Sequence, residues 1–309
     1  MIHGIIDIGS NTIRLNVYRV NDTKFELLFS KKENAGIVSY IKKKQMSQEG
    51  IDKLERCLTR FKSILDALQI TSFSAFATAS LRNITNTQDV ISQIYEHTQI
   101  PINLLSGSQE GQISFLGAIH NLEHKQGIYI DTGGASTEII LYKDQQIQYV
   151  NSLPVGSLNL YNKYVHQLIP TSSEMKQMQQ KIIKELKYLD LSKNTVTCKY
   201  LAITGGSMRA IRSILVYLKK IPNDVFEFPS NLVFELVDEL SKNPIDTMHL
   251  FLKVKPDRVH TLFCGLIIIS TLAKYTKAQT IQVSCNGVRE GYLIQKYIQG
   301  DVPYANNTK

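Results

Sequence analysis

The chain has 309 residues, of which 43% are hydrophobic and 20% are charged. This composition excludes a disordered chain, and the length is too great for one ordinary core but suits two domains. The net charge of +8 favours an anionic partner, because a positive surface raises the local concentration of anions.

The first elements are a strand, a polar turn and a second strand over Gly4–Leu15, and the same order recurs over Gly127–Leu141. In each copy an apolar strand ends in an aspartate, Asp7 or Asp131, and a turn of small residues follows. The copies lie a domain's length apart, so the sequence predicts a duplicated unit.

Further strands and helices follow each copy. After the first copy we expect elements at 25–29, from Ser47, and at 73–77, 87–98, 102–105 and 107–120. After the second copy we expect them at 147–153, 157–164, 173–188, 200–203, 207–218, 232–240, 259–275 and 281–284, and from Val288. Three sequential strands followed by alternating helices and strands predict an α/β fold with mixed sheets. We therefore expect domains over 1–124 and 125–309, with a cleft between them and the last segment packed on the first domain.

The lack of a recognisable secretory signal and the wide spacing of the cysteines together predict a cytoplasmic location. The N-terminus lacks the basic region of a secretory signal. The longest apolar run, Leu262–Leu272, is shorter than the ~20 residues that span a bilayer and is expected to be a buried helix. The four cysteines show no metal-binding or redox spacing. We expect no membrane partner, and no nucleic-acid partner either, because aromatic and basic residues are not interleaved.

Both turns suggest phosphate binding. Successive N–H groups in a turn of small residues form a concavity that binds anions. The turn residues are Gly9, Ser10, Gly133, Gly134, Ala135, Ser136 and Thr137. Asp7 and Asp131 would hold Mg²⁺ or Mn²⁺, since Mg²⁺ takes one or two carboxylates together with phosphate oxygens and water. The alternative is a plain hairpin turn in which each aspartate forms an Asx-turn.

A third motif lies in the segment Leu105–Gly111. Ser106 and Gln109 have the spacing of a helix capping box. Glu110 then falls in the first helical turn, where a carboxylate can simply compensate the helix dipole. A catalytic carboxylate is the other interpretation.

Seven blocks of the sequence together resemble the family of exopolyphosphatases and guanosine-pentaphosphate phosphatases (Ppx/GppA). In chain order they are DIGSNTIRL, ATASLRNITN, LLSGSQEG, IDTGGASTE, SLPVGSLNL, ITGGSMRAI and NGVREGYL. The resemblance covers nearly the whole chain, in the short two-domain form of the family. It implies two duplicated ribonuclease-H-like domains of the actin/hexokinase/Hsp70-like kind, with the site in the cleft between them.

The resemblance also implies a role for each matching residue. Glu110 matches the general base for the attacking water, Glu138 the glutamate that orients water or metal, and Asp131 the aspartate beside the metal. Phosphate-binding positions correspond to Ser10, Asn11, Arg14, Gly133, Gly134, Ala135, Ser136, Thr137, Gly205 and Gly206. Arg82 matches an arginine near the phosphate, and Arg289-Glu290-Gly291 matches the last block. The alternatives are a helix-start salt bridge for Arg82 and a structural ion pair for Arg289-Glu290.

The chain departs from the family pattern at several positions. Ala135 replaces a glycine, Gly111-Gln112 replaces Ala-Arg, and His260 replaces an acid. An alanine keeps the N–H group but has narrower backbone freedom than glycine. The extra C-terminal helical domains of long family members are absent from the sequence, which makes us expect less processivity on very long chains.

The expected function is metal-assisted hydrolysis of inorganic polyphosphate from its ends. The alternatives are removal of the terminal phosphate from guanosine pentaphosphate, phosphate transfer from ATP, and a non-catalytic sensor of polyphosphate or nucleotide. A homodimer is compatible with the sequence.

Overall fold

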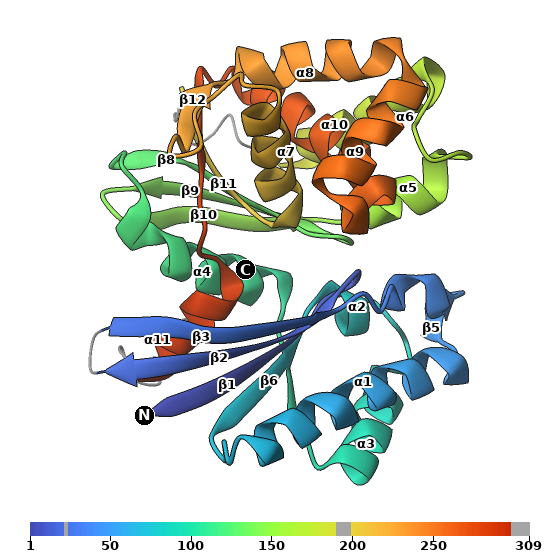
Figure 1. Cartoon of the computed structure of the whole chain (residues 1–309), viewed down its shortest axis with the longest axis vertical. Coiled ribbons are helices and arrows are strands. Elements are labelled where there is room, and N and C mark those ends of the chain that lie inside the picture. The colour runs from blue at the N-terminus through green and yellow to red at the C-terminus, as the bar shows by residue number, and fades with distance from the viewer. Residues whose placement is uncertain (22–23, 190–198, 298–309) are drawn as a thin grey trace. The chain divides into compact units, whose positions relative to one another are not determined.

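The computed structural model describes residues 1–21, 24–189 and 199–297. The chain forms two compact units, the first from Met1–Ile113 with the segment that starts at Val288, and the second from Ser114–Gly287 (Figure 1). Each unit contains a mixed β-sheet with helices. The predicted α/β fold class is confirmed.

The sheet of the first unit has the strand order β3-β2-β1-β6-β7. The strands are β1 (Ile2–Ile8), β2 (Ile13–Asn21), β3 (Lys24–Glu33), β6 (Phe73–Ala77) and β7 (Ile102–Leu104), and a small separate hairpin contains β4 (Ile41–Lys42) and β5 (Gln45–Met46). β1, β2 and β3 are antiparallel neighbours, whereas β6 and β7 run parallel to β1. This is the predicted order of three sequential strands followed by crossovers.

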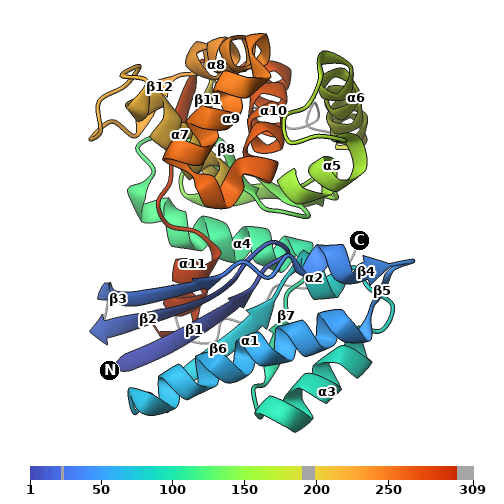
Figure 2. The same cartoon turned by 45° about the vertical axis from the view of Figure 1, so that its right-hand side comes forward.

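Helices cover both faces of this sheet (Figure 2). They are α1 (Gln48–Ala67), α2 (Ala79–Arg82), α3 (Thr87–Thr98), the start of α4 (Gly107–Ala118) and α11 (Val288–Tyr297), with a 3₁₀ turn, η1 (Ile37–Tyr40). α1 starts at Ser47, whose side chain accepts from the N–H of Gly50. Its buried residues recur every three or four positions and pack on one face of the sheet with Ile6 and Ile8.

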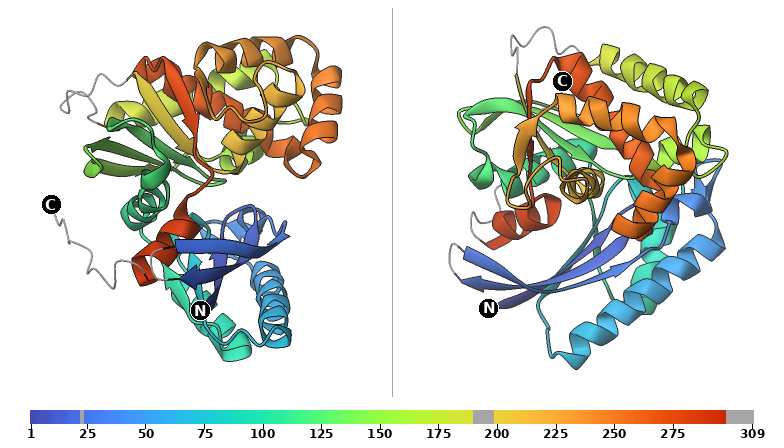
Figure 3. Two further views of the ribbon diagram at one scale, coloured as in Figure 1. Left: turned by 60° about the vertical axis from the view of Figure 1, so that its left-hand side comes forward. Right: turned by 45° about the horizontal axis from the view of Figure 1, so that its top comes forward.

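The opposite face of the sheet packs on α11, which returns to the first unit from the far end of the sequence (Figure 3). Ile5 and Leu293 share one buried cluster there. Side chains alternate between the faces of a strand, so Asp7 and Tyr18 point to the same face as Ile5. The last helix therefore contacts the polar residues of the first two strands.

The sheet of the second unit has the order β10-β9-β8-β11-β13-β12. Its strands are β8 (Gln126–Thr132), β9 (Thr137–Lys143), β10 (Gln146–Leu153), β11 (Tyr200–Thr204), β12 (Glu227–Pro229) and β13 (Thr280–Val283). The first five positions in this order repeat the pattern of the first unit, with three antiparallel strands and then parallel ones. The duplication that the sequence predicts is confirmed.

One long apolar helix forms the centre of the second unit. The helices are α5 (Ser157–Tyr164), α6 (Ser172–Tyr188), α7 (Gly206–Tyr217), α8 (Asn231–Lys242), α9 (Pro244–Val254) and α10 (Val259–Thr276), with 3₁₀ turns η2 (Ile119–Asn121) and η3 (Pro256–Arg258). The helical stretch Pro256–Thr276 has the length and hydropathy of a membrane span, but 78% of its most apolar window is buried inside the structure. α10 is the buried core helix expected around Leu262–Leu272.

Candidate active site

The first candidate phosphate loop connects β1 to β2. The N–H of Gly9 donates to the carbonyl oxygen of Thr12 at 3.1 Å. A Cβ at Gly9 would lie 2.9 Å from that oxygen, so only glycine fits without a shift. The carbonyl groups of Ser10 and Asn11 accept from the N–H groups of Val38 (3.3 Å) and Gly36 (2.9 Å). The chain that follows β3 thus fixes the conformation of this loop.

Asp7 and Arg14 are cross-strand partners in β1 and β2. The Asp7 carboxylate forms an ion pair with Arg289, whose Nη1 lies 2.9 Å from Oδ2. Burial raises the pKa of Asp7, while the nearby guanidinium groups of Arg289 and Arg14 act against that rise. A divalent cation at Asp7 would have to compete with Arg289, so the structure does not favour Asp7 as a metal ligand.

Arg82 and Glu110 come together within the first unit. Arg82 Nη1 donates to Glu110 Oε2 at 2.8 Å and to the carbonyl oxygen of Leu105 at 3.0 Å. The two side chains are 17% and 12% exposed, so the pair is largely shielded from water. The capping box predicted at the start of α4 is present, because Ser106 and Gln109 each accept from the other's backbone N–H. Glu110 is therefore held by both the helix start and a guanidinium.

The second candidate phosphate loop lies directly on the first turn of α5. The carbonyl of Gly133 accepts from the N–H of Ser157 at 3.0 Å, and that of Gly134 accepts from Leu158 at 2.9 Å. The Asn159 side chain donates to the carbonyl of Ala135 at 2.8 Å. The N-terminal N–H groups of α5 are thus occupied by this loop.

The loop approaches α5 so closely that only glycine fits at the helix N-cap. A Cβ at Gly156 would lie 2.3 Å from the carbonyl carbon and oxygen of Gly134 and from the nitrogen of Ala135. This is well inside van der Waals contact, and the atoms met are backbone. Gly156 is a residue that sequence reasoning did not assign to the site, although it stands within the block SLPVGSLNL.

This contact determines where the loop amides point. In a trans peptide the N–H points opposite to the C=O, and the described residues contain no cis peptide. The amides of Gly134, Ala135 and Ser136 therefore point away from α5, and none donates a hydrogen bond to another described residue. Successive amides of a turn that lack a partner within the protein are the kind of donor set that can bind a phosphate.

Two residues of this loop, Ala135 and Thr137, have a conformation or a partner that the sequence did not predict. Ala135 does not have a positive φ, so an alanine replaces the family's glycine here without backbone strain. The hydroxyl of Thr137 donates to the carbonyl oxygen of Val155 at 2.7 Å and is fully buried. Thr137 therefore stabilises the base of the loop, and its hydroxyl is already used.

Asp131 and Glu138 are direct cross-strand partners in β8 and β9, so their side chains project from the same face of the sheet. Ser114 of α4 donates to Asp131 Oδ2 and also bonds the hydroxyl of Tyr129 at 2.9 Å. Ser152 donates to Glu138 Oε1 at 2.8 Å. Each carboxylate is thus oriented by a hydroxyl group, which sequence reasoning did not foresee.

These two carboxylates suit a Mg²⁺ ion that is also held by water and substrate, rather than a metal ion held by protein ligands alone. Within the described residues no three His, Cys, Asp or Glu side chains converge as a metal site. Mg²⁺ usually keeps several waters and binds through one or two carboxylates plus substrate phosphate oxygens. Asp131 and Glu138 meet that requirement without a third protein ligand.

The turn between β11 and α7 packs against the end of β8. Gly205 has φ +105°, and a Cβ there would lie 2.4 Å from the carbonyl oxygen of Thr132. A Cβ at Gly206 would lie 2.0 Å from Nη2 of Arg258. Gly205 thus lies next to Thr132, the residue that follows Asp131, and Gly206 allows the guanidinium of Arg258 to approach.

Arg258 is a second residue that the sequence did not point to. It lies in η3, outside the seven blocks, and burial lowers the pKa of its guanidinium, with Asp257 opposing that change. His260, which replaces an acid of the family pattern, makes an edge-on contact with Tyr161 at 5.6 Å between ring centroids. Arg258 thus lies beside the turn that contains Gly206, and His260 lies beside α5.

Two α/β units with one strand order, each with a small-residue loop beside a carboxylate, define a protein of the phosphate-handling class. The sequence pattern of the Ppx/GppA phosphatase family matches residues 16–299, so the chain belongs to that family. The resemblance that the seven blocks indicate is confirmed.

Several relatives support a phosphatase. The chain is 22% identical to a putative exopolyphosphatase of Haemophilus influenzae, over 95% of this chain and 91% of the relative. It is 28% identical to a bifunctional 3-dehydroquinate synthase/phosphatase of Fusobacterium nucleatum, covering 94% of this chain but only 46% of that protein. The chain thus spans less than half the length of the bifunctional relative.

Solved structures share the fold at low sequence identity. An exopolyphosphatase from Cytophaga hutchinsonii superposes with a TM-score of 0.84 at 20% identity, over 96% of this chain and 97% of the other. The Ppx/GppA family member of Aquifex aeolicus gives 0.77 at 21% identity, over 96% and 97%. These likenesses concern the fold of the chain.

Proposed function

We propose that this protein hydrolyses the terminal phosphoanhydride bond of inorganic polyphosphate. The observation that carries the proposal is the second loop, in which the carbonyl groups of Gly133, Gly134 and Ala135 accept from α5 and the amides of Gly134, Ala135 and Ser136 are left to bind an anion. The net charge of +8 supports a highly anionic substrate over a neutral one.

In the proposed reaction, water attacks the terminal phosphorus and the bond to the bridging oxygen breaks. Glu110 accepts the proton of the attacking water, and the released chain leaves with the bridging oxygen. General-base catalysis of this kind contributes roughly 10²–10⁴-fold in rate. Arg82 holds the Glu110 carboxylate at 2.8 Å and so orients it.

The remaining groups neutralise charge, which is the main requirement of phosphoryl transfer. We assign the amides of Gly134, Ala135 and Ser136 to the equatorial phosphate oxygens. Asp131 and Glu138 would hold Mg²⁺ or Mn²⁺, which supplies positive charge next to those oxygens when bound. Losing one preorganised donor commonly lowers the rate by ~10²–10³-fold.

Removal of the terminal phosphate from guanosine pentaphosphate uses the same chemistry and is the second candidate, because the family includes guanosine-pentaphosphate phosphatases. Purified protein with Mg²⁺ or Mn²⁺ is assayed in parallel for phosphate release from short polyphosphate, long polyphosphate, guanosine pentaphosphate and ATP. We expect the highest kcat/KM for polyphosphate. Preference for the guanosine substrate would establish the second candidate, and turnover of none, with retained binding, would indicate a sensor.

The matched variants are Glu110→Gln and Glu96→Gln. Glu96 is an exposed carboxylate on α3, so its loss removes the same charge from the same unit at a remote helix. We expect Glu110→Gln to abolish most turnover and Glu96→Gln to leave it unchanged. Equal rates for the two variants would overturn the assignment of Glu110.

A further inference from the structure

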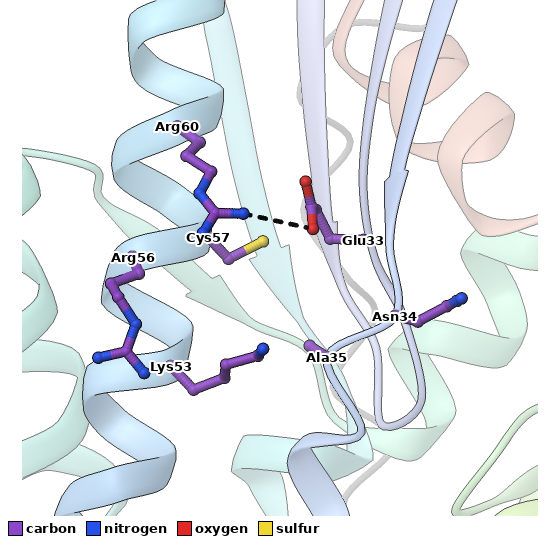
Figure 4. Close-up of a pocket in the computed structure, with 7 residues that line it drawn as sticks. All are labelled: Glu33, Asn34, Ala35, Lys53, Arg56, Cys57 and Arg60. Atoms are coloured by element: carbon purple, nitrogen blue, oxygen red, sulfur yellow. Dashed lines mark ion pairs between the residues drawn. The ribbon is translucent and has the colours of Figure 1, made fainter.

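A small hollow lies between α1 and the end of β3 with the residues that follow it, and its lining includes none of the residues assigned to the reaction. Its volume is about 30 Å³, and it is lined by Glu33, Asn34, Ala35, Lys53, Arg56, Cys57 and Arg60. Figure 4 shows Lys53 extending from α1 toward Ala35 and Arg60 reaching toward Glu33, while Arg56 runs along the helix. Lys53, Arg56 and Arg60 are spaced three and four residues apart, which places them on one face of the helix. We call this set of seven residues the α1 hollow.

The α1 hollow has an excess of positive charge. Three basic side chains and one carboxylate line it, and that carboxylate, Glu33, lies 3.7 Å from Arg60. This pair is exposed to solvent, so it contributes little and exchanges readily for another anion. Neither Lys53 nor Arg56 pairs with a carboxylate among the described residues.

None of the four acidic residues of α1 is among the residues that line the hollow. Glu55 pairs with His97 at 2.8 Å, and Asp66 pairs with Lys62 at 2.5 Å. Asp52 accepts a hydrogen bond from Gln48 at 2.8 Å. The lining of the α1 hollow therefore carries three basic side chains and one carboxylate.

The shape of the α1 hollow restricts what it can bind. Its floor includes the thiol of Cys57, which is 4% exposed. Burial raises the pKa of that thiol to about 12, so it stays neutral and does not repel an anion. A hollow of this size holds one or two water-sized groups, which is enough for phosphate oxygens.

We propose that the α1 hollow binds a phosphate group, either as free inorganic phosphate or as one unit of a polyphosphate chain. The guanidinium groups of Arg56 and Arg60 offer paired donors that match phosphate oxygens, and Lys53 adds a point charge. The polyphosphate source rests on the proposed function, whereas binding of the phosphate group itself does not. A second anchoring point would retain the anionic chain between turnovers.

Chemical footprinting of the unmodified protein tests this directly. Arg56 and Arg60 are labelled with an arginine-selective dicarbonyl and quantified by mass spectrometry, with and without polyphosphate, at matched ionic strength. We expect several-fold slower labelling of both, and no change at Arg19, an exposed arginine paired with Glu26. Protection by inorganic phosphate as well identifies a free-anion site, and protection by polyphosphate alone identifies a chain site. Absence of selective protection, or protection by single-stranded RNA but not by polyphosphate, overturns the proposal.

Binding measurements with variants give a second, independent readout. In the Glu110→Gln protein, replacement of Lys53, Arg56 and Arg60 by Gln should weaken polyphosphate binding roughly tenfold, since each exposed charge pair contributes about 1.5- to 5-fold. The matched control replaces three exposed lysines of α6, Lys176, Lys184 and Lys187, and should change Kd less than twofold.

A variant of opposite sign excludes a purely structural explanation. Glu33→Gln removes the carboxylate of the α1 hollow and should tighten polyphosphate binding by about two- to threefold. Unchanged or weaker binding in that variant, or equal losses in both triple variants, contradicts the proposal. The proposed function is judged separately by the turnover of the unsubstituted protein. Hydrolysis without protection at Arg56 and Arg60 sinks only the second site, and protection without hydrolysis sinks only the reaction.

Discussion

Arg289 in the last helix lies 2.9 Å from Asp7 in the first strand, although 282 residues separate them. The next residue, Glu290, accepts a hydrogen bond of 2.6 Å from the hydroxyl of Tyr18 in β2. Consecutive residues of α11 thus bond neighbouring strands of the first unit. The Asp7–Arg289 ion pair gives the buried Asp7 carboxylate a counter-ion and joins the C-terminal segment to this sheet.

Removal of Arg289 should destabilise the protein strongly. Both partners are largely buried, with side chains 16% and 14% exposed, and breaking a buried pair leaves an uncompensated charge. We expect Arg289→Met to lower the free energy of unfolding by about 3–5 kcal/mol, measured by urea denaturation. The double variant with Asp7→Asn should recover much of this loss. Arg19→Gln, which breaks an exposed pair with Glu26, should cost under ~1 kcal/mol.

The Arg82–Glu110 pair predicts non-additive kinetics. Glu110→Gln should lower kcat by ~10²–10⁴-fold with little change in substrate binding. Arg82→Gln should lower kcat less, because the carboxylate remains but loses its orientation. Since the two residues act as one unit, the double variant should be hardly slower than Glu110→Gln. Multiplicative losses in kcat would show that Arg82 acts independently of Glu110.

The contact between the second loop and α5 predicts opposite outcomes for two small substitutions. Gly156→Ala places a Cβ 2.3 Å from backbone atoms of Gly134 and Ala135, so the loop must shift and turnover should fall at least ~10-fold. Ala135→Gly relieves no strain, because φ at this position is already negative. It should lower stability by ~0.4–1 kcal/mol through the unfolded chain. Faster turnover in Ala135→Gly would contradict the geometry of this loop.

His3 makes the stability of the first unit depend on pH. The ring is fully buried, and its nitrogens bond the hydroxyls of Ser72 (2.8 Å), Ser74 (3.1 Å) and Tyr297 (2.7 Å). Burial, together with the charge of Lys296, lowers the pKa of His3 from 6.5 to about 4.

The sign of the pH effect follows from that shift. Between pH 6.5 and 4 the unfolded chain binds a proton that the folded protein excludes, so stability is fully present above pH 6.5 and falls as the pH is lowered. The loss of stability reaches ~3 kcal/mol once the pH has fallen through the folded pKa. Urea midpoints measured from pH 7 to 4 should fall more steeply for the unsubstituted protein than for His3→Gln. Parallel curves would contradict this role.

The sequence predicted most regular elements because their signals are local. The largely apolar α10 and the capping box before Glu110 were both identifiable from residue order. It did not predict β12, the hairpin of β4 and β5, or α9. β12 has only three residues and ends in Pro229, which gives it no periodicity. α9 begins with Asn243 as N-cap and a proline in its first turn, which is a local helix-start signal.

Sequence order alone determined the duplicated strand-turn-strand unit, the small residues of both loops and the membership of a phosphatase family, because each of these depends on residue types at short spacing. Only the tertiary structure decided which residues lie next to one another. Asp7 pairs with Arg289, Arg258 approaches Gly206, and Ser114 orients Asp131. These contacts join residues that are distant in the chain or come from separate elements. They depend on side-chain packing across strands and helices, which no local pattern encodes.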